Sequence, residues 1–265
     1  MKKPFIIAID GLDCSGKSTY AKELFGYMEY TFPELKIVLQ HFPVYENKTG
    51  QRILDFLHNG ADLTDPNKRN RMIQMQIKNR VEWWLDITKH INMPDIIICD
   101  RYMESNCIYN AGVYSPRIQC QYIRELENKS PVPRPDIQVF TFCDPRLQWK
   151  RIMEKQNKDN YENQDATTQL IKSYPSYIEN YKRDVNDKYI MVATHLMDNE
   201  YMTSHANVYL NDEIALLCDD ISITYNKLII GRISKEMKEK VNMTKDDYTS
   251  IQVMTIGEWK MVSSI

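Results

Sequence analysis

Short apolar runs alternate with segments of helical spacing through most of the chain. The runs are Phe5–Ile9, Lys36–Gln40, Asp95–Cys99, Ile137–Phe142 and Tyr189–Val192. Continuous apolar runs of this length are typical of strands buried on both faces of a parallel sheet. The helical spacing covers Ser18–Tyr30, Asn67–Asn92, Ser115–Asn128 and Pro145–Glu154. This alternation predicts an α/β fold of three layers, in which helices flank a parallel five-stranded sheet.

Two segments lack this alternation. Lys155–Ala166 is polar without apolar periodicity, which is typical either of a surface loop or of a lid over a bound phosphate. Further on, Asp212–Lys240 has the spacing of a long helix, and Asp247–Val262 alternates as one or two strands do. We therefore expect one α/β domain over residues 1–199, with a lid at about 154–166, and an α+β C-terminal extension over 200–265. The extension carries no catalytic motif and is expected to cover a sheet edge or to form a dimer surface.

The first apolar run leads directly into a G-x-x-x-x-G-K-[ST] phosphate-binding loop, with helical spacing after it. The residues expected to bind ATP are Gly11, Leu12, Asp13, Cys14, Ser15, Gly16, Lys17, Ser18 and Thr19. The glycines let backbone N–H groups surround a phosphate, and the start of the following helix favours the same anion. Lys17 adds a positive charge at the β- and γ-phosphates, and Ser18 offers a hydroxyl group to Mg²⁺.

Charged residues follow the third apolar run. Asp100 comes directly after that run, and an acid at the end of a strand beside a phosphate loop can hold Mg²⁺ or its water ligands. The next residue, Arg101, would place a bidentate cation in the same crevice, because ligands bind at the carboxyl ends of parallel strands. The sequence His41-Phe-Pro-Val-Tyr45 follows the second run in the same way.

The long helical segment before the third run has two kinds of side chain. Its apolar stripe is best interpreted as core, and consists of Met72, Met75, Trp83, Trp84 and Ile87. Arg80 lies among them, and the commoner fate of a helical arginine is a surface charge paired with a neighbouring acid.

Composition narrows the partners and the compartment. The net charge of −2 gives no long-range attraction to nucleic acid polymers or acidic membranes, so neither is expected as a partner. The six cysteines form no C-x-x-C pair and no metal-binding spacing, and Cys99 and Cys143 lie in apolar runs as small core residues. No signal peptide or membrane-spanning run is evident. We expect a reducing cytoplasmic location, which is the host cytosol if the source is viral.

Taken together, these pieces resemble the thymidylate kinase family over roughly residues 3–195. The matching pieces, in family order, are Gly11-Leu-Asp13, Phe42-Pro43 with Gly50, Asn79-Arg80-x-Glu82, Asp100-Arg101-Tyr102-x-x-Ser105 with Tyr109, Arg134-Pro-Asp136 and Tyr161-Glu162-Asn163. The resemblance implies a P-loop NTPase fold and the transfer of a phosphoryl group from ATP to dTMP with Mg²⁺. It also implies a homodimer formed through helices near the second and third strands.

The resemblance assigns roles to individual side chains. Asp13 would bind the sugar 3′-hydroxyl, Tyr109 would exclude a 2′-hydroxyl, and Arg80 would donate to O4 of the pyrimidine. The substrate-binding residues it implies are Asp13, Phe42, Pro43, Tyr45, Gln76, Arg80, Arg101, Ser105, Tyr109 and Tyr161. The catalytic residues it implies, with lysines of the lid, are Lys17, Asp100, Arg101, Lys155 and Lys158, and the metal would be held by Ser18 and Asp100.

Four positions depart from the family pattern. Tyr45 stands where the family has an arginine that clamps the acceptor phosphate, and Cys14 where one branch has a loop arginine. Asn160 stands where the other branch has a lid arginine, and Gln76 replaces an aromatic residue that stacks on thymine. Lys155 and Lys158, with Arg151 before them, could supply the missing charge without the planar fork of arginine.

These departures leave alternatives open. A polar side chain at position 76 could hydrogen-bond a polar group at C5, so a C5-modified dUMP or another monophosphate is an alternative acceptor. A deoxynucleoside kinase, with Asp100 as the base that deprotonates a 5′-hydroxyl, is a further alternative. So is a catalytically weak nucleotide-binding protein whose extension serves a partner.

Overall fold

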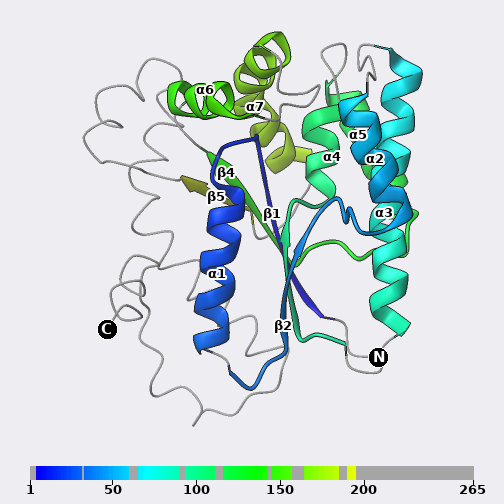
Figure 1. Ribbon diagram of the computed structural model, residues 1–265, viewed down its shortest axis with the longest axis vertical. Coiled ribbons are helices and arrows are strands. Elements are labelled where there is room, and N and C mark those ends of the chain that lie inside the picture. The colour runs from blue at the N-terminus through cyan, green and yellow to red at the C-terminus, as the bar shows by residue number, and fades with distance from the viewer. Residues whose placement is uncertain are drawn as a thin grey trace.

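The computed structural model describes residues 4–31, 33–59, 65–89, 93–110, 116–142, 145–156, 164–184 and 190–194. Its centre is a sheet of five parallel strands in the order β2-β3-β1-β4-β5 (Figure 1). The strands are β1 (Phe5–Gly11), β2 (Ile37–His41), β3 (Ile96–Asp100), β4 (Ile137–Phe142) and β5 (Ile190–Thr194). The predicted parallel sheet is therefore confirmed.

Helices cover both faces of this sheet, which confirms the three layers (Figure 1). Within the described ranges they are α1 (Lys17–Thr31), α2 (Lys48–His58), α3 (Pro66–Lys89), α4 (Met103–Asn110), α5 (Pro116–Asn128), α6 (Pro145–Glu154) and α7 (Gln164–Asp184). On one face, Leu24 of α1 packs with Ile7 of β1. On the other, Val81 of α3 packs with Ile6, because successive residues of a strand point to opposite faces. The expected core stripe on α3 is confirmed, since Met72 is fully buried and Trp83, Trp84 and Ile87 pack against the core.

The structure corrects several predicted boundaries. β1 runs two residues past its apolar stretch, because Asp10 and Gly11 pair with Phe140 and Thr141 of β4. α7 begins at Gln164, so the polar segment expected to be a loop as far as Ala166 is helical at its end. The sequence pattern also did not predict α2, α4 or α7. Nearly all of α4 is buried, and its buried side chains include several polar ones, so it has no amphipathic stripe.

A close packing contact sets the entrance to α2. Asn47 caps this helix, and its side chain accepts a hydrogen bond of 2.7 Å from the backbone N–H of Gly50. A Cβ atom on Gly50 would lie 1.8 Å from the carbonyl oxygen of Val44. Only glycine allows α2 to pack this closely on the segment after β2, which carries Phe42 and Tyr45 into the site.

Parts of the predictions fall outside the described residues. These are the C-terminal extension over 200–265, Cys143, Lys158, Asn160 and Tyr161. Cys99 is fully buried, as predicted. Among the described helices, none combines the length and apolar character needed to cross a membrane.

Candidate active site

The phosphate-binding loop joins β1 to α1 at the carboxyl edge of the sheet, where it was predicted. Cys14 and Gly16 have positive φ values of 60° and 89°, which curl the backbone. Lys17 is buried, and its Nζ donates a hydrogen bond of 2.5 Å to the carbonyl oxygen of Leu12 across the loop. Burial and the charge of Arg101 lower the pKa of Lys17 to about 8. The loop therefore holds a poorly solvated cation that an incoming phosphate would stabilise.

Two side chains of α6 hold the outer side of this loop. Gln148 Nε2 donates to the carbonyl oxygen of Asp13 at 2.6 Å, and Arg151 Nη1 donates to that of Cys14 at 3.1 Å. On the sheet side, Ser15 and Thr141 hydroxyls are 2.7 Å apart. Sequence reasoning did not identify Gln148, because a single polar residue in a helical pattern carries no signal of its own.

Asp100 ends β3 beside the start of α1. Its Oδ2 lies 3.0 Å from Nδ1 of His41, and its side chain also shares a hydrogen bond with Ser18. Burial would raise the pKa of Asp100, but the hydrogen bonds of His41 and Ser18 outweigh burial and lower it. Its other oxygen, Oδ1, is buried and has no hydrogen-bond partner among the described residues. An unsatisfied carboxylate oxygen beside a serine hydroxyl group fits Mg²⁺, which prefers oxygen ligands.

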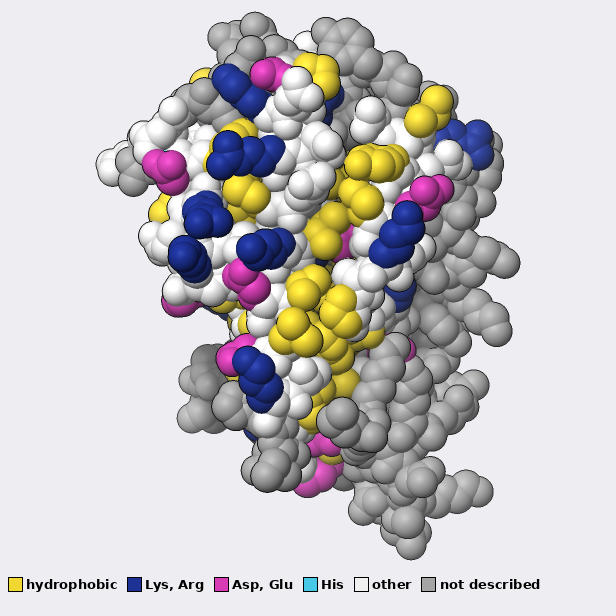
Figure 2. Space-filling view, turned by 90° about the vertical axis from the view of Figure 1, so that its right-hand side faces the viewer, with side chains coloured by type: hydrophobic (Ala, Val, Ile, Leu, Met, Phe, Trp, Pro, Cys, Tyr) yellow, Lys and Arg dark blue, Asp and Glu magenta, His cyan; other side chains and the backbone are white. Residues whose placement is uncertain are grey.

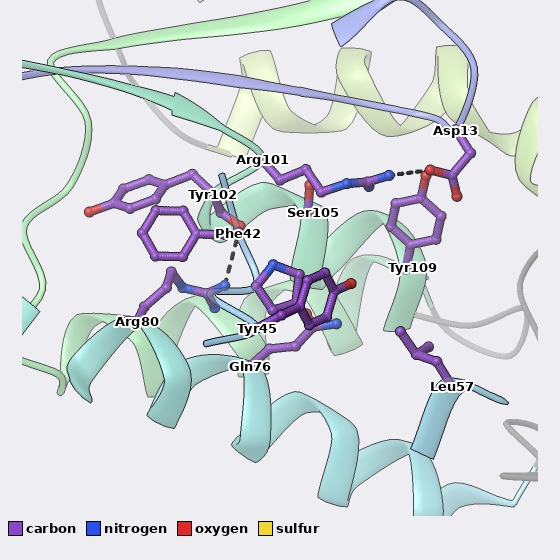
Figure 3. Close-up of a pocket in the computed structure, with 11 residues that line it drawn as sticks. Asp13, Phe42, Tyr45, Leu57, Gln76, Arg80, Arg101, Tyr102, Ser105 and Tyr109 are labelled. Atoms are coloured by element: carbon purple, nitrogen blue, oxygen red, sulfur yellow. Dashed lines mark hydrogen bonds and ion pairs between the residues drawn. The ribbon is translucent and has the colours of Figure 1, made fainter. Parts of the chain in front are cut away.

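Arg101 and Asp13 form an ion pair between the β3–α4 junction and the phosphate loop (Figure 3). Arg101 has a φ of 68°, which turns its side chain toward the loop, and its guanidinium lies 5.4 Å from the ring centre of Tyr109. Burial would raise the pKa of Asp13, but the charges of Arg101 and Lys17 outweigh it and lower the pKa to about 2. Asp13 is therefore ionised at neutral pH.

A buried carboxylate fixes the turn that carries Arg101. Asp10 Oδ1 accepts hydrogen bonds from the backbone N–H groups of Tyr102 at 2.8 Å and Ser105 at 3.0 Å, and from the Ser105 hydroxyl group. Gln138 Nε2 donates to its other oxygen at 3.0 Å. Burial raises the pKa of Asp10 despite these donors. Ser105, expected to bind substrate, thus lines the site but donates its hydroxyl hydrogen to Asp10.

A cavity of about 520 Å³, including its open mouth, extends from this ion pair (Figure 3). Its lining residues are Asp13, Phe42, Pro43, Tyr45, Leu57, Gln76, Arg80, Arg101, Tyr102, Ser105 and Tyr109. Apart from Tyr161, which is not described, the structure thus brings every residue expected to bind the acceptor to one cavity. Asp13, Arg101 and Tyr109 lie at one end of it. Arg80 lies at the other, near Phe42 and Tyr102.

Arg80 is buried, so the interpretation as a surface charge is wrong. Its guanidinium forms an ion pair with Glu127 of α5, and Nη1 donates to the carbonyl oxygen of Tyr102 at 3.4 Å. Gln76, one turn earlier on α3, lines the cavity and makes no hydrogen bond to the described part of the chain. Tyr45 packs with Leu57 beside it. The walls at this end are aromatic and apolar, and the polar groups here are Arg80 and Gln76.

Lys155 follows the end of α6 and is exposed, while Lys158 lies outside the described residues. The positive charge of Lys155 contributes to the low pKa of Asp13, so it acts over the phosphate loop.

Comparisons with known proteins agree with this geometry. The family model described as "Thymidylate kinase" matches residues 9–201. A thymidylate kinase of Schizosaccharomyces pombe is 28% identical over 180 residues, which are 64% of this chain and 74% of that protein. A probable thymidylate kinase of Sulfolobus acidocaldarius is 28% identical over 186 residues, or 68% and 84% of the two chains. The solved thymidylate kinase of Candida albicans, at 21% identity, covers 78% of this chain and 91% of its own with a TM-score of 0.54, which supports the fold.

Proposed function

The chain belongs to the thymidylate kinase family and is a nucleoside monophosphate kinase that uses ATP, and we propose that its acceptor is dTMP, which it converts to dTDP. The observation that carries this proposal is the cavity whose lining joins Asp13 of the phosphate loop to Arg80. It has an ion pair at the end that would take the phosphate and a hydrogen-bond donor at the end that would take the base. Phosphoryl transfer needs mainly positioning and charge neutralisation, which these residues supply.

The donor binds at the phosphate loop. Backbone N–H groups of the loop surround the β-phosphate, and Lys17 exchanges its hydrogen bond with Leu12 for the β- and γ-phosphate oxygens. Ser18 and the unpartnered Oδ1 of Asp100 would hold Mg²⁺, which neutralises phosphate charge when it is bound.

The acceptor phosphate binds on the side of Arg101 that faces the cavity, and the donor phosphates lie on the side of the phosphate loop. The guanidinium, held between Asp13 and Tyr109, bridges the acceptor phosphate and the transferring group. Phe42 and Pro43 line the monophosphate pocket, and Tyr45 donates one hydrogen bond in place of an arginine. Lys155 supplies part of the remaining positive charge near the phosphates, and Lys158 would add a second lysine charge.

Three side chains select the sugar and the base of the acceptor. The ionised carboxylate of Asp13 accepts a hydrogen bond from the 3′-hydroxyl, and the ring of Tyr109 leaves no room for a 2′-hydroxyl. Arg80 donates to O4 of thymine, and a 4-amino group in that place would leave two donors facing each other. Cytosine should therefore bind poorly, because its 4-amino group cannot accept the hydrogen bond that Arg80 donates.

A C5-modified dUMP is the second candidate acceptor. The observation that favours it is Gln76, whose amide lines the cavity without a hydrogen bond to the described residues. A hydroxyl group at C5 of the base could bond to this amide, whereas the methyl group of thymine could not.

The proposal includes a cytosolic homodimer. Exposed apolar side chains include Leu85 of α3 and Ile118 and Tyr122 of α5. Figure 2 shows apolar side chains gathered on the side of the molecule where these two helices lie. Such a patch is typical of an interface. Within the described residues, the thiols of Cys99, Cys107 and Cys120 are buried and form no disulfide bond, and the proposal places the protein in a reducing compartment.

A coupled assay of ADP release tests the proposal. With ATP, Mg²⁺ and dTMP, the wild-type protein should form ADP and dTDP in equal amounts, and thymidine should not replace dTMP. Lys17→Met is the control that excludes a contaminating kinase. Turnover of thymidine without turnover of dTMP would instead identify a deoxynucleoside kinase.

A further inference from the structure

The base end of the cavity is supported by a carboxylate that does not line it. Glu127 lies on α5, and its side chain is 1% exposed. It forms an ion pair with Nη2 of Arg80, which is 3% exposed and belongs to α3. A buried carboxylate is costly unless it is paired, so Arg80 and Glu127 hold each other in place.

The carboxylate is itself fixed. Asn106 of α4 donates from Nδ2 to Oε1 of Glu127 at 3.2 Å and to the carbonyl oxygen of Ile73 at 3.3 Å. Helices α3, α4 and α5 are thereby joined at one point beneath the cavity. These contacts hold Glu127 in place, so its side chain does not shift when a bound base moves slightly.

The guanidinium of Arg80 is held at two of its corners. Glu127 binds Nη2, and the carbonyl oxygen of Tyr102 binds Nη1 at 3.4 Å. A guanidinium is planar, with five N–H bonds in fixed directions, so two anchored corners set its plane. The remaining N–H bonds then have fixed directions, and Figure 3 shows the guanidinium on the side of the cavity that Gln76 and Tyr45 line.

We propose that Glu127 is a positioning residue for base selection: it fixes the plane of Arg80 so that an N–H donor faces the 4-position of the acceptor base. This inference rests on the proposed function, in which the base binds at the Arg80 end of the cavity. A fixed donor accepts a 4-oxo group and opposes a 4-amino group. Without Glu127 the guanidinium can turn away, so a 4-amino base is no longer opposed and a 4-oxo base is held less well.

Glu127 is remote from the reacting phosphates, and this predicts which kinetic constant changes. Binding of the base should weaken while the chemical step is retained, so KM for dTMP rises and kcat stays near the wild-type value. A merely structural role would lower the amount of active protein, and therefore kcat, equally for every acceptor.

The chain offers a matched control for a buried glutamate–arginine pair. Glu104 of α4 is also 1% exposed and pairs with Arg124 of α5, with Oε2 and Nη2 2.9 Å apart. Neither residue lines the cavity. Loss of this pair should affect folding without changing the choice of base.

The experiment compares kcat/KM for dTMP and dCMP in full-length Glu127→Gln, Glu104→Gln and wild-type protein, with thermal unfolding measured alongside. Glu127→Gln should lower the dTMP-to-dCMP ratio about tenfold through KM, while Glu104→Gln keeps the wild-type ratio. Asn106→Ala, which loosens the same carboxylate, should give a smaller fall and serves if Glu127→Gln does not fold. In an Arg80→Met background, Glu127→Gln should not change the ratio further.

Two results would overturn the inference while leaving the proposed function intact. One is a wild-type ratio in both folded variants, Glu127→Gln and Asn106→Ala. The other is an equal fall in Glu104→Gln, which would mean that any break between α4 and α5 disturbs the site. If the wild-type protein does not turn over dTMP in the same assay, the proposed function itself fails.

Discussion

Arg101 and Asp13 form an ion pair at the phosphate end of the cavity, although they are 88 positions apart in the chain. The pair links the turn after β3 to the phosphate loop after β1, and side-chain exposure is 21% for Arg101 and 17% for Asp13. Two groups that would contact the acceptor nucleotide are therefore oriented before any ligand binds. Preorganisation of this kind lowers the entropic cost of a productive complex.

Replacement of Arg101 by methionine should destabilise the protein in a pH-dependent way. The pair lowers the pKa of Asp13 to about 2, so its stabilisation is complete above the ordinary aspartate pKa and is lost as the pH falls toward 2. At pH 7, Arg101→Met should lower the free energy of unfolding by about 2 kcal/mol. As the pH falls from 5 to 3, the difference in the free energy of unfolding between Arg101→Met and wild type should become smaller by about 1 kcal/mol, as measured by urea unfolding.

The exposed Arg52 on α2 provides the control, because Arg52→Met removes one positive charge away from Asp13. If the free energies of unfolding of Arg101→Met and wild type differ by the same amount across this pH range, the pair does not lower the pKa of Asp13.

Lys17→Met should abolish turnover with little effect on the fold. Lys17 is the cation inside the phosphate loop, and its charge acts where negative charge develops during transfer. We expect kcat to fall about a thousandfold. Circular dichroism and unfolding should be close to wild type, because the long-chain replacement keeps the buried packing. A rate near wild type would remove the phosphate loop from the mechanism.

Lys155→Ala should lower the maximal rate about tenfold, because its charge acts on the same end of the site as Asp13. Lys150 is an exposed lysine on α6, the helix that Lys155 follows, and it pairs with Glu154 at 4.0 Å. Lys150→Ala should leave the rate unchanged. Equal rates for both variants would leave Lys155 without a role; the double variant with Lys158→Ala would then test whether either lysine contributes.

His41→Ala should raise the Mg²⁺ concentration needed for half-maximal rate about tenfold, because a hydrogen-bond partner of a metal-binding carboxylate orients that carboxylate. His41 holds Oδ2 of Asp100 at 3.0 Å, which leaves Oδ1 directed away from it. Gln40→Ala is the matched control, since the Gln40 side chain donates a hydrogen bond of 2.8 Å to the carbonyl oxygen of His41 rather than to Asp100. If titration of Mg²⁺ gives the same midpoint for His41→Ala as for wild type, Asp100 does not need this partner.

The centre of the sheet was predictable because β1 and β3 consist mainly of continuous apolar residues and are buried along their whole length, and a strand buried on both faces has few alternatives. Of the helices that were not predicted, α4 lacks a regular apolar stripe. In α4, Glu104, Ser105 and Asn106 are buried through contacts with Arg124, Asp10 and Glu127, which lie far away in the chain. No local pattern contains those partners.

The same distinction applies to the site. Lys17, Asp100 and Arg101 were identified because they follow strands at motif spacing. His41, Gln148 and Glu127 were not, since each acts on another side chain or on the loop backbone. Gln148 and Glu127 lie within helical patterns that give no reason to select them. The partners of a catalytic group depend on tertiary packing, whereas the group itself is marked by its place after a strand.

The acceptor profile of the wild-type protein tests most directly whether dTMP is the acceptor. ADP release would be measured with ATP, Mg²⁺ and, in separate reactions, dTMP, dUMP, 5-hydroxymethyl-dUMP, dCMP, dGMP, dAMP and UMP. We expect the highest kcat/KM with dTMP. Arg80 should reject dCMP, and Tyr109 should reject UMP. A preference for 5-hydroxymethyl-dUMP would make Gln76 the specificity determinant. Preference for dCMP or a purine nucleotide, or no turnover with any acceptor, would contradict the assignment of the cavity to a thymine nucleotide.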